Sequence, residues 1–292
     1  MENKTKAKLK RGEIAIGHFI LEFATPGVGQ MIANAGYDYI LFDMEHSSFT
    51  QESIRQAILS AKVAGITPIV RVQDTEYFLM SRPLDAGAQG LMIPRVETRD
   101  QVLKIIDSAK YPPVGVRGSA FGIAHDDYKG GDIAAGTKNA NEETLIIVQT
   151  ETAKSVDNVD QILSVEGVDV AWIGQADMTV SLGIPGQYDH PKFLKAFDKI
   201  LNACDKYGVA PGYIPLTIED AIMMLDKGIR CLAYSADVFL YSLALKEGMR
   251  QIKEHIDSGK KETPPKQEEP KESDEKGRVI DLGGGRKYRL TW

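Results

Sequence analysis

The sequence has few of the features that mark secreted, membrane or nucleic-acid-binding proteins. Only two cysteines occur, Cys204 and Cys231, without the spacing of a metal motif, and we expect buried free thiols in a cytoplasmic protein. No apolar run is long enough to span a bilayer, and no apolar segment follows the basic N-terminus as in a signal peptide. The net charge of −6 gives no reason to expect nucleic acid or an anionic membrane as partner.

Three catalytic patterns are also missing. No G-x-S-x-G segment occurs, so nucleophilic serine chemistry has no support. No G-x-G-x-x-G turn opens the first helix, which disfavours a doubly wound open sheet. None of the strand-like segments contains a lysine, whereas an aldolase that forms an imine needs a desolvated lysine inside its barrel.

Strand-like and helix-like segments alternate along most of the chain. The strand-like segments span residues 15–20, 37–45, 67–72, 90–96, 145–151, 168–177, 209–215 and 230–239, and the last helix runs to about residue 256. Eight such repeats predict the α/β class and a (β/α)₈ TIM barrel, with the open sheet as the alternative. A Gly- and Asp-rich loop, roughly residues 112–143, separates the fourth unit from the fifth.

The composition changes after the eighth repeat and predicts three parts. Residues 1–259 would form the barrel, residues 260–277 a disordered charged linker, and residues 278–292 two β-like runs that could pair as a hairpin. The hairpin could dock on its own barrel, on a neighbouring subunit or on another partner, or it could have no function.

Two carboxylates follow neighbouring parallel strands, Glu151 after the fifth and Asp177 after the sixth. The carboxyl ends of parallel strands meet at one end of the sheet, so these acids are expected to lie together, with Gln149 on the same strand face. Such a set offers only oxygen ligands, which suits Mg²⁺ or Mn²⁺ better than zinc. The alternative is that both acids cap the helices that follow.

Other ionisable residues are predicted at the same rim, where barrels of this class carry their active sites. Arg71 could hold a carboxylate or oxyanion through two parallel hydrogen bonds. His46 titrates near neutral pH, and Asp43 or Glu45 beside it would raise its basicity. Taken singly, Arg71 could be a structural ion pair and His46 a loop residue without a role, while Asp237 is the main ionisable group of the last two strands.

Six motifs across about residues 13–256 resemble those of one enzyme family. They are FDMEHSSF, PIVRV, LDAGAQGLMIPRV, YPPVGVRG, VQTETAKSVDNVDQI and WIGQADMTVSLGIPGQYDHP, and they resemble the HpcH/HpaI aldolase family of class II pyruvate aldolases. The resemblance implies a (β/α)₈ barrel in which Glu151 and Asp177 ligate Mg²⁺, Mn²⁺ or Co²⁺. Pyruvate would chelate this metal through its carboxylate and keto oxygens.

The resemblance also implies roles for single residues. Arg71 would stabilise the enolate oxygen, and His46, paired with Asp43, would act as base through a metal-bound water. Asp85 matches a residue that family members place in the neighbouring subunit's site. Family members are commonly hexamers, trimers of dimers that exchange the eighth helix, and the resemblance implies the same assembly here. The remaining residues expected to bind substrate are Gln149, Gly174, Ala176 and Asp177.

The implied reaction is the cleavage of a 4-hydroxy-2-oxo acid to pyruvate and an aldehyde. Oxaloacetate decarboxylation at the same site is the alternative, and a non-catalytic 2-oxo acid sensor or scaffold is a second one. The loop 112–143, with Arg117 and His125, could reach over the site and select the substrate. The chain departs from the family pattern at Gln175, where many relatives have proline, and in the tail after residue 258.

Overall fold

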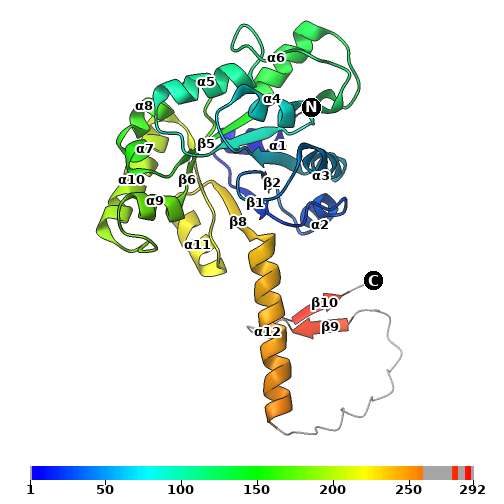
Figure 1. Ribbon diagram of the computed structural model, residues 1–292, viewed down its shortest axis with the longest axis vertical. Coiled ribbons are helices and arrows are strands. Elements are labelled where there is room, and N and C mark those ends of the chain that lie inside the picture. The colour runs from blue at the N-terminus through cyan, green and yellow to red at the C-terminus, as the bar shows by residue number, and fades with distance from the viewer. Residues whose placement is uncertain (1, 259–277, 282–286, 291–292) are drawn as a thin grey trace. The chain divides into compact units, whose positions relative to one another are not determined.

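Eight parallel strands close into a barrel in the computed structural model, which describes residues 2–258, 278–281 and 287–290 (Figure 1). The strands are β1 (Ala15–Ile20), β2 (Tyr39–Asp43), β3 (Thr67–Arg71), β4 (Gly90–Ile93), β5 (Leu145–Thr150), β6 (Val170–Ile173), β7 (Ala210–Tyr213) and β8 (Cys231–Ala236). Because β8 pairs with β1, the (β/α)₈ prediction is confirmed and the open-sheet alternative is wrong.

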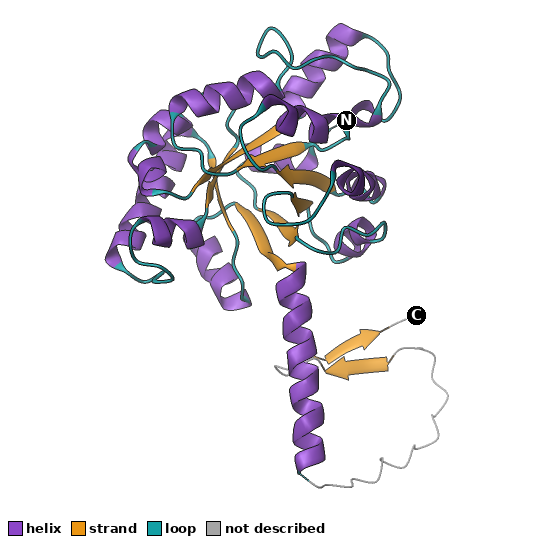
Figure 2. Ribbon diagram, in the orientation of Figure 1, coloured by secondary structure: helices purple, strands orange, loops and turns teal. Residues whose placement is uncertain are grey.

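Helices alternate with these strands, and the helices that precede β8 surround the barrel (Figure 2). The helices that follow strands are α2 (Val28–Asn34), α3 (Gln51–Val63), α4 (Tyr77–Asp85), α5 (Arg99–Ala109), α7 (Ala153–Asp157), α8 (Val159–Leu163), α9 (Gln175–Ser181), α10 (Pro191–Tyr207), α11 (Ile218–Asp226) and α12 (Asp237–Asp257). No helix within the described ranges combines the length and the apolarity that crossing a membrane requires.

Local sequence sets where many helices begin and end. Thr50, Thr98 and Thr152 each cap a helix, and the threonine hydroxyl accepts a hydrogen bond from the backbone of the third helical residue. Helix α10 has Pro191 at its first position and ends at Gly208 in the left-handed conformation. The threonines and Pro191 thus fix where these helices begin, and Gly208 ends α10 so that the chain can turn into β7.

The core has two layers. Inside the barrel, Trp172 is 1 % exposed and packs edge-on against Phe19, with ring centroids 5.9 Å apart. A side chain at Gly17 would collide with the Tyr39 ring, so glycine at this position makes room for a large interior residue. The second and larger layer lies between the strands and the helices.

Two segments are more ordered than the sequence predicts. The interval 112–143 is only partly loop, because it contains the 3₁₀ turn η1 (Ala124–Asp126) and the helix α6 (Ile133–Glu143), capped by Asp132. The basic N-terminus forms helix α1 (Lys4–Lys10), with Asn3 as its cap. The predicted loop therefore overstated the irregular part of the chain.

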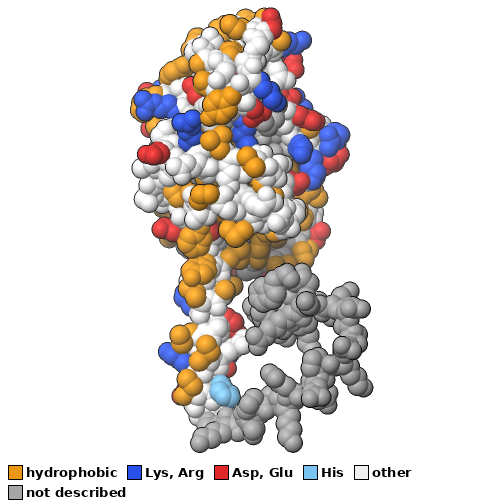
Figure 3. All heavy atoms as spheres, turned by 90° about the vertical axis from the view of Figure 1, so that its right-hand side faces the viewer, with side chains coloured by type: hydrophobic (Ala, Val, Ile, Leu, Met, Phe, Trp, Pro, Cys, Tyr) orange, Lys and Arg blue, Asp and Glu red, His pale blue; other side chains and the backbone are white. Residues whose placement is uncertain are grey.

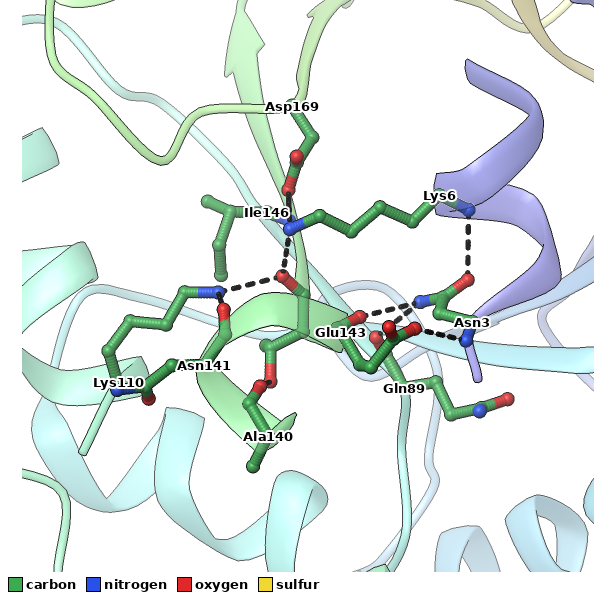
Figure 4. Close-up of polar contacts among 10 residues, drawn as sticks. Asn3, Lys6, Gln89, Lys110, Ala140, Asn141, Glu143, Ile146 and Asp169 are labelled. Atoms are coloured by element: carbon green, nitrogen blue, oxygen red, sulfur yellow. Dashed lines mark hydrogen bonds and ion pairs between the residues drawn. The ribbon is translucent and has the colours of Figure 1, made fainter. Parts of the chain in front are cut away.

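Helix α1 is tied to the end of the barrel where the strands begin (Figure 4). Lys6 Nζ donates to the Thr144 carbonyl at 2.7 Å and to Asp169 Oδ2 at 2.9 Å. Lys110 Nζ donates to the same Thr144 carbonyl at 2.9 Å. Asn3 Nδ2 donates to the carbonyl of Gln89 at 2.8 Å. Because these partners precede β4, β5 and β6, the network closes the bottom of the barrel.

The chain divides into two compact units, Met1–Val238 and Phe239–Trp292. In the second unit, β9 (Arg278–Asp281) pairs with β10 (Lys287–Leu290) in antiparallel fashion. The predicted linker at 260–277 lies outside the described residues. Both cysteines are buried free thiols, as expected, and burial raises the pKa of each to about 12.

Candidate active site

An arginine–aspartate pair stands at the carboxyl ends of two adjacent strands. Asp43 ends β2, Arg71 ends β3, and the parallel register places them directly opposite each other. Arg71 donates from Nε to Asp43 Oδ1 at 2.8 Å and from Nη2 to Asp43 Oδ2 at 2.6 Å. The guanidinium also lies over the Phe19 ring, 5.2 Å from its centroid. Two-point pairing and stacking fix the Arg71 fork at the mouth of the barrel.

Glu45 links this pair to His46. One Glu45 oxygen lies 3.4 Å from Arg71 Nη1 and 3.7 Å from His46 Nε2. Burial raises the pKa of Glu45, while the charges of Arg71 and His46 act to lower it. Of the two carboxylates that the sequence offers as partners for His46, the structure brings Glu45 into contact with it, while Arg71 binds both Asp43 oxygens.

Glu151 follows β5 and is 2 % exposed. Its Oε1 accepts a hydrogen bond from the backbone N–H of Arg95 at 2.7 Å, and its Oε2 accepts one from Gln149 Nε2 at 2.5 Å. The pKa of Glu151 is raised to about 7, mainly by burial. The hydrogen bond from Arg95 lowers this pKa, while the charges of Asp177 and Glu45 raise it. A cation beside Glu151 would favour its charged form.

Asp177 comes from a helix and not from a strand end. Strand β6 stops at Ile173, and Asp177 lies exposed in the first turn of α9, so the predicted strand to residue 177 was too long. Gly174, between strand and helix, is buried against Glu151, and any side chain there would collide with the Glu151 carboxylate. Ala176 is exposed on the same turn. Glycine at 174 thus lets α9 bring Asp177 close to Glu151.

The oxygen atoms of this cluster suit a divalent cation. Gln149 Oε1 is buried and has no hydrogen-bond partner, while the same side chain contacts Glu151. No group of three or more His, Cys, Asp or Glu residues that could hold a metal occurs in the described part of the chain, so Glu151 and Asp177 would be the only charged ligands. Two carboxylates and an amide oxygen fit Mg²⁺ or Mn²⁺ and leave positions for substrate oxygens or water.

Two rim residues have roles that their side-chain types do not reveal. Arg95 contributes its backbone N–H to Glu151 and adopts a left-handed φ of 51°, a strained conformation that the neighbouring structure must hold. Asp237 accepts hydrogen bonds from the N–H groups of Leu21, Glu22 and Phe23 at 2.7–2.9 Å, so it shapes the loop after β1. A backbone donor leaves no pattern in side-chain chemistry, and Arg95 was therefore missed.

Asp85 and the segment 112–143 lie away from this chain's own rim. Asp85 ends α4, which runs back from the mouth of the barrel to the opposite end, and its Oδ1 accepts from Arg117 Nη2 at 2.6 Å. The segment 112–143 joins α5 to β5, so its ends lie where the strand begins. His125 Nε2 donates to the carbonyl of Ala120 in its own loop at 2.7 Å. These contacts favour the alternative that the segment is a surface excursion, and its role over a site stays a prediction.

Comparison with known proteins points to one family. The family model described as HpcH/HpaI aldolase/citrate lyase matches residues 19–244. A 2-keto-3-deoxy-L-rhamnonate aldolase of Escherichia coli is 31% identical over 253 residues, which cover 87% of this chain and 94% of that protein. The crystal structure of an HpcH/HpaI aldolase from Desulfitobacterium hafniense DCB-2 has a TM-score of 0.82 and 33% identity, covering 85% of this chain and 96% of that one. The crystal structure of an HpcH/HpaI aldolase/citrate lyase family protein from Burkholderia cenocepacia J2315 has a TM-score of 0.80 and 31% identity, covering 86% of this chain and 99% of that one.

Proposed function

The chain belongs to the HpcH/HpaI aldolase/citrate lyase family and is an aldolase, hence a carbon–carbon lyase, and we propose that it is the metal-dependent, class II kind. Its substrate would be a 4-hydroxy-2-oxo acid, cleaved reversibly to pyruvate and an aldehyde. The observation that carries this proposal is the Arg71 fork, held by Asp43, at the same rim as the oxygen cluster of Gln149, Glu151 and Asp177.

Glu151, Asp177 and the Gln149 amide oxygen would hold the divalent cation. When bound, Mg²⁺, Mn²⁺ or Co²⁺ supplies Lewis-acid charge that favours the enolate form of a 2-oxo acid. The buried Gln149 Oε1 without a partner and the raised pKa of Glu151 both support a cation at this position, because each is a group that positive charge would stabilise.

The chain's own side chains supply orientation and proton transfer. Arg71 donates two hydrogen bonds to Asp43 through Nε and Nη2, and its Nη1 lies toward Glu45. Nη1 can also donate to a substrate oxygen and stabilise the negative charge that develops on that oxygen. His46, with its side chain 59 % exposed and Glu45 beside it, is placed to take the proton of the 4-hydroxyl group, directly or through water. Backbone groups at Gly174 and Ala176, beside Asp177, would contact the pyruvate half.

The related Escherichia coli protein acts on 2-keto-3-deoxy-L-rhamnonate, a sugar acid, and a 2-keto-3-deoxy sugar acid is therefore one candidate for this chain. A dicarboxylic 4-hydroxy-2-oxo acid, such as 4-hydroxy-2-oxoheptanedioate, is the other. Both contain the 4-hydroxy-2-oxo acid unit that the site would cleave, and they differ only in the aldehyde that is released.

We also propose that the enzyme is a hexamer of helix-exchanging dimers. An apolar groove on the barrel, between α2 and α11, is lined by residues that include Ile16, Tyr37 and Ile222, of which Ile222 is 55 % exposed. Helix α12 presents exposed apolar side chains at helical spacing, which are Leu245, Met249, Ile252 and Ile256 (Figure 3). In the proposed assembly, α12 of a second copy fills the groove, and Asp85 enters a neighbouring site.

The function is tested by pyruvate release from a panel of 4-hydroxy-2-oxo acids and oxaloacetate, with EDTA and with added Mg²⁺, Mn²⁺ or Co²⁺. The expected result is release from a hydroxy-oxo acid that EDTA abolishes and metal restores. Glu151→Gln combined with Asp177→Asn should abolish both metal binding and turnover, and turnover in this double variant would contradict the class II mechanism. Release from oxaloacetate alone would indicate a decarboxylase instead.

A further inference from the structure

Two buried ammonium groups meet at the carboxyl end of α6 (Figure 4). Lys6 comes from α1 and Lys110 caps the end of α5, and both side chains donate to the carbonyl oxygen of Thr144, at 2.7 and 2.9 Å. Lys110 also donates to the carbonyl of Asn141, in the last turn of α6, at 2.6 Å. The carboxyl end of a helix attracts a cation, but two cations in one buried site repel each other.

The two lysines differ in what can balance their charge. Lys6 Nζ forms an ion pair with Asp169 Oδ2 at 2.9 Å, whereas Lys110 Nζ contacts only two carbonyl oxygens among the described residues. These carbonyls satisfy the two N–H groups of a neutral amine, and the third proton of an ammonium group would have no acceptor among the same residues. Burial and the charge of Lys6 lower the pKa of Lys110 to about 7. Lys110 is therefore the member of the pair that releases its proton as the pH rises.

The other charged and titratable groups around Lys110 come from each element packed against it. They are Lys6 and Lys10 in α1, Glu143 in α6, Asp169 before β6, and Tyr111 and Arg117 after α5. Burial raises the pKa of Tyr111, so its phenol stays neutral. Carboxylates, arginines and ordinary lysines keep their charge between about pH 6 and 9. A change in α1 over this range would thus report the proton of Lys110.

We infer that Lys110 makes the docking of α1 dependent on pH. With α1 docked, the charge of Lys6 lies beside Lys110 and disfavours its protonated form, and release of α1 removes this repulsion. Docking and protonation therefore oppose each other, and by linkage each weakens the other by the same factor. Docking of α1 strengthens as the pH rises from about 7, because the released state binds the proton more tightly. This device lies at the bottom of the barrel and does not depend on the proposed function.

The first measurement is the titration of Lys110 in the full chain. NMR of protein labelled with ¹³C at the lysine ε-carbons follows the ionisation of this side chain, and we expect a midpoint of about 7 in the wild type. Lys6→Met removes the neighbouring charge and keeps an apolar side chain of similar length. It should raise the Lys110 midpoint by about one pH unit or more, the effect of a nearby charge in a poorly screened site.

The second measurement follows α1 itself. The backbone N–H of Ala7 donates to the carbonyl of Asn3 at 2.9 Å, so its hydrogen exchange, corrected for the intrinsic rate, reports opening of the helix. A shift of one unit in the Lys110 midpoint corresponds to a tenfold change in the docking constant, so protection of this N–H should rise about tenfold between pH 6 and 9. Lys110→Met should remove this pH dependence.

Lys8→Met is the matched control. Lys8 lies on the same helix but pairs with Asp38 at 2.7 Å and not with α6. Its loss should lower the protection of α1 by the same factor at every pH and leave the Lys110 midpoint unchanged.

Three results would overturn the inference. They are a wild-type Lys110 midpoint of about 10, as in an ordinary lysine, an equal midpoint in Lys6→Met and wild type, and wild-type protection of α1 that does not change with pH. If Lys110→Met does not fold, the wild-type and Lys6→Met titrations decide the question without it.

Discussion

Glu151 is a buried residue whose charge state should respond to both pH and metal. Folding raises its pKa from about 4.3 in an unfolded chain to about 7. The native protein therefore binds this proton more tightly than the unfolded chain does. In the absence of metal, its contribution to stability is most favourable below pH of about 4, declines as the pH rises toward 7, and stays reduced above that value.

The first prediction follows from this dependence of stability on pH. Glu151→Gln removes the buried charge and should stabilise the metal-free protein at pH 8 by about 3 kcal/mol, with little effect at pH 4. Denaturant unfolding in EDTA at both pH values measures the difference. Glu142→Gln, at an exposed position, is the matched control and should leave the free energy of unfolding unchanged at both pH values. Equal stabilisation at both pH values would show that burial of the charge is not the cause.

Arg71 gives the second prediction. A lysine has no planar fork, so Arg71→Lys loses the two-point pairing with Asp43 and moves the charge away from the substrate oxygen. We expect kcat to fall by a factor of about 100 or more, with a smaller change in the KM for the hydroxy-oxo acid. Steady-state kinetics at saturating metal check this. A raised KM with unchanged kcat would assign Arg71 to substrate binding alone.

The types of residue at the rim could be predicted from the sequence, but their pairings could not. Strand-terminal positions identified Asp43, Arg71 and Glu151, because parallel strands end together. The choice of Glu45 as the partner of His46 depends on side-chain geometry after Arg71 has taken both Asp43 oxygens. The strained backbone at Arg95 depends on the tertiary structure, which propensity does not encode.

At the scale of elements, the repeat of strand and helix was predictable, whereas α1 and α6 were not. Buried strands are continuous apolar runs, and several helices have threonine or proline signals at their starts. Helix α1 is short and basic, and contacts with residues far along the chain stabilise it, such as Asn3 with Gln89 and Lys8 with Asp38. Such contacts are invisible in a local pattern.

Asn3 carries the third prediction, because one side chain does two tasks. It caps α1 by accepting from Lys6 N at 2.9 Å, and it donates to the carbonyls of Gln89 and Glu143 at 2.8 and 3.1 Å (Figure 4). Asn3→Ala should lower the free energy of unfolding by about 2 kcal/mol. Thermal or denaturant unfolding checks this.

A control variant and a kinetic measurement show whether the effect of Asn3→Ala is purely structural. Asn202→Ala, at an exposed position of α10, should be nearly neutral. The kcat of Asn3→Ala should match that of the wild type, because Asn3 lies at the opposite end of the barrel from the rim. A loss of kcat larger than the loss of folded protein would contradict a purely structural role for α1.

At the scale of the whole molecule, the exposed apolar surfaces argue for assembly. A helix that remains alone in water places polar residues on its surface, but α12 presents an apolar stripe, and the groove between α2 and α11 is apolar as well. From the sequence, exchange of the eighth helix was expected only because the chain resembles its family, and the exposed apolar residues of α12 add a physical reason for it. The predicted linker at 260–277 and the role of residues 278–292 remain predictions.

The fourth prediction tests the exchange of α12. Ile222→Glu places a charge in the groove, where a second copy's helix would have to bury it, and burial of an unpaired charge is strongly unfavourable. Light scattering after size exclusion should give six chains for the wild type and fewer for Ile222→Glu. Val63→Glu, on α3 and 89 % exposed, is the control and should keep the wild-type mass. A monomeric wild type, or an Ile222→Glu variant of unchanged mass, would contradict the exchange, since neither result is compatible with a helix buried in this groove.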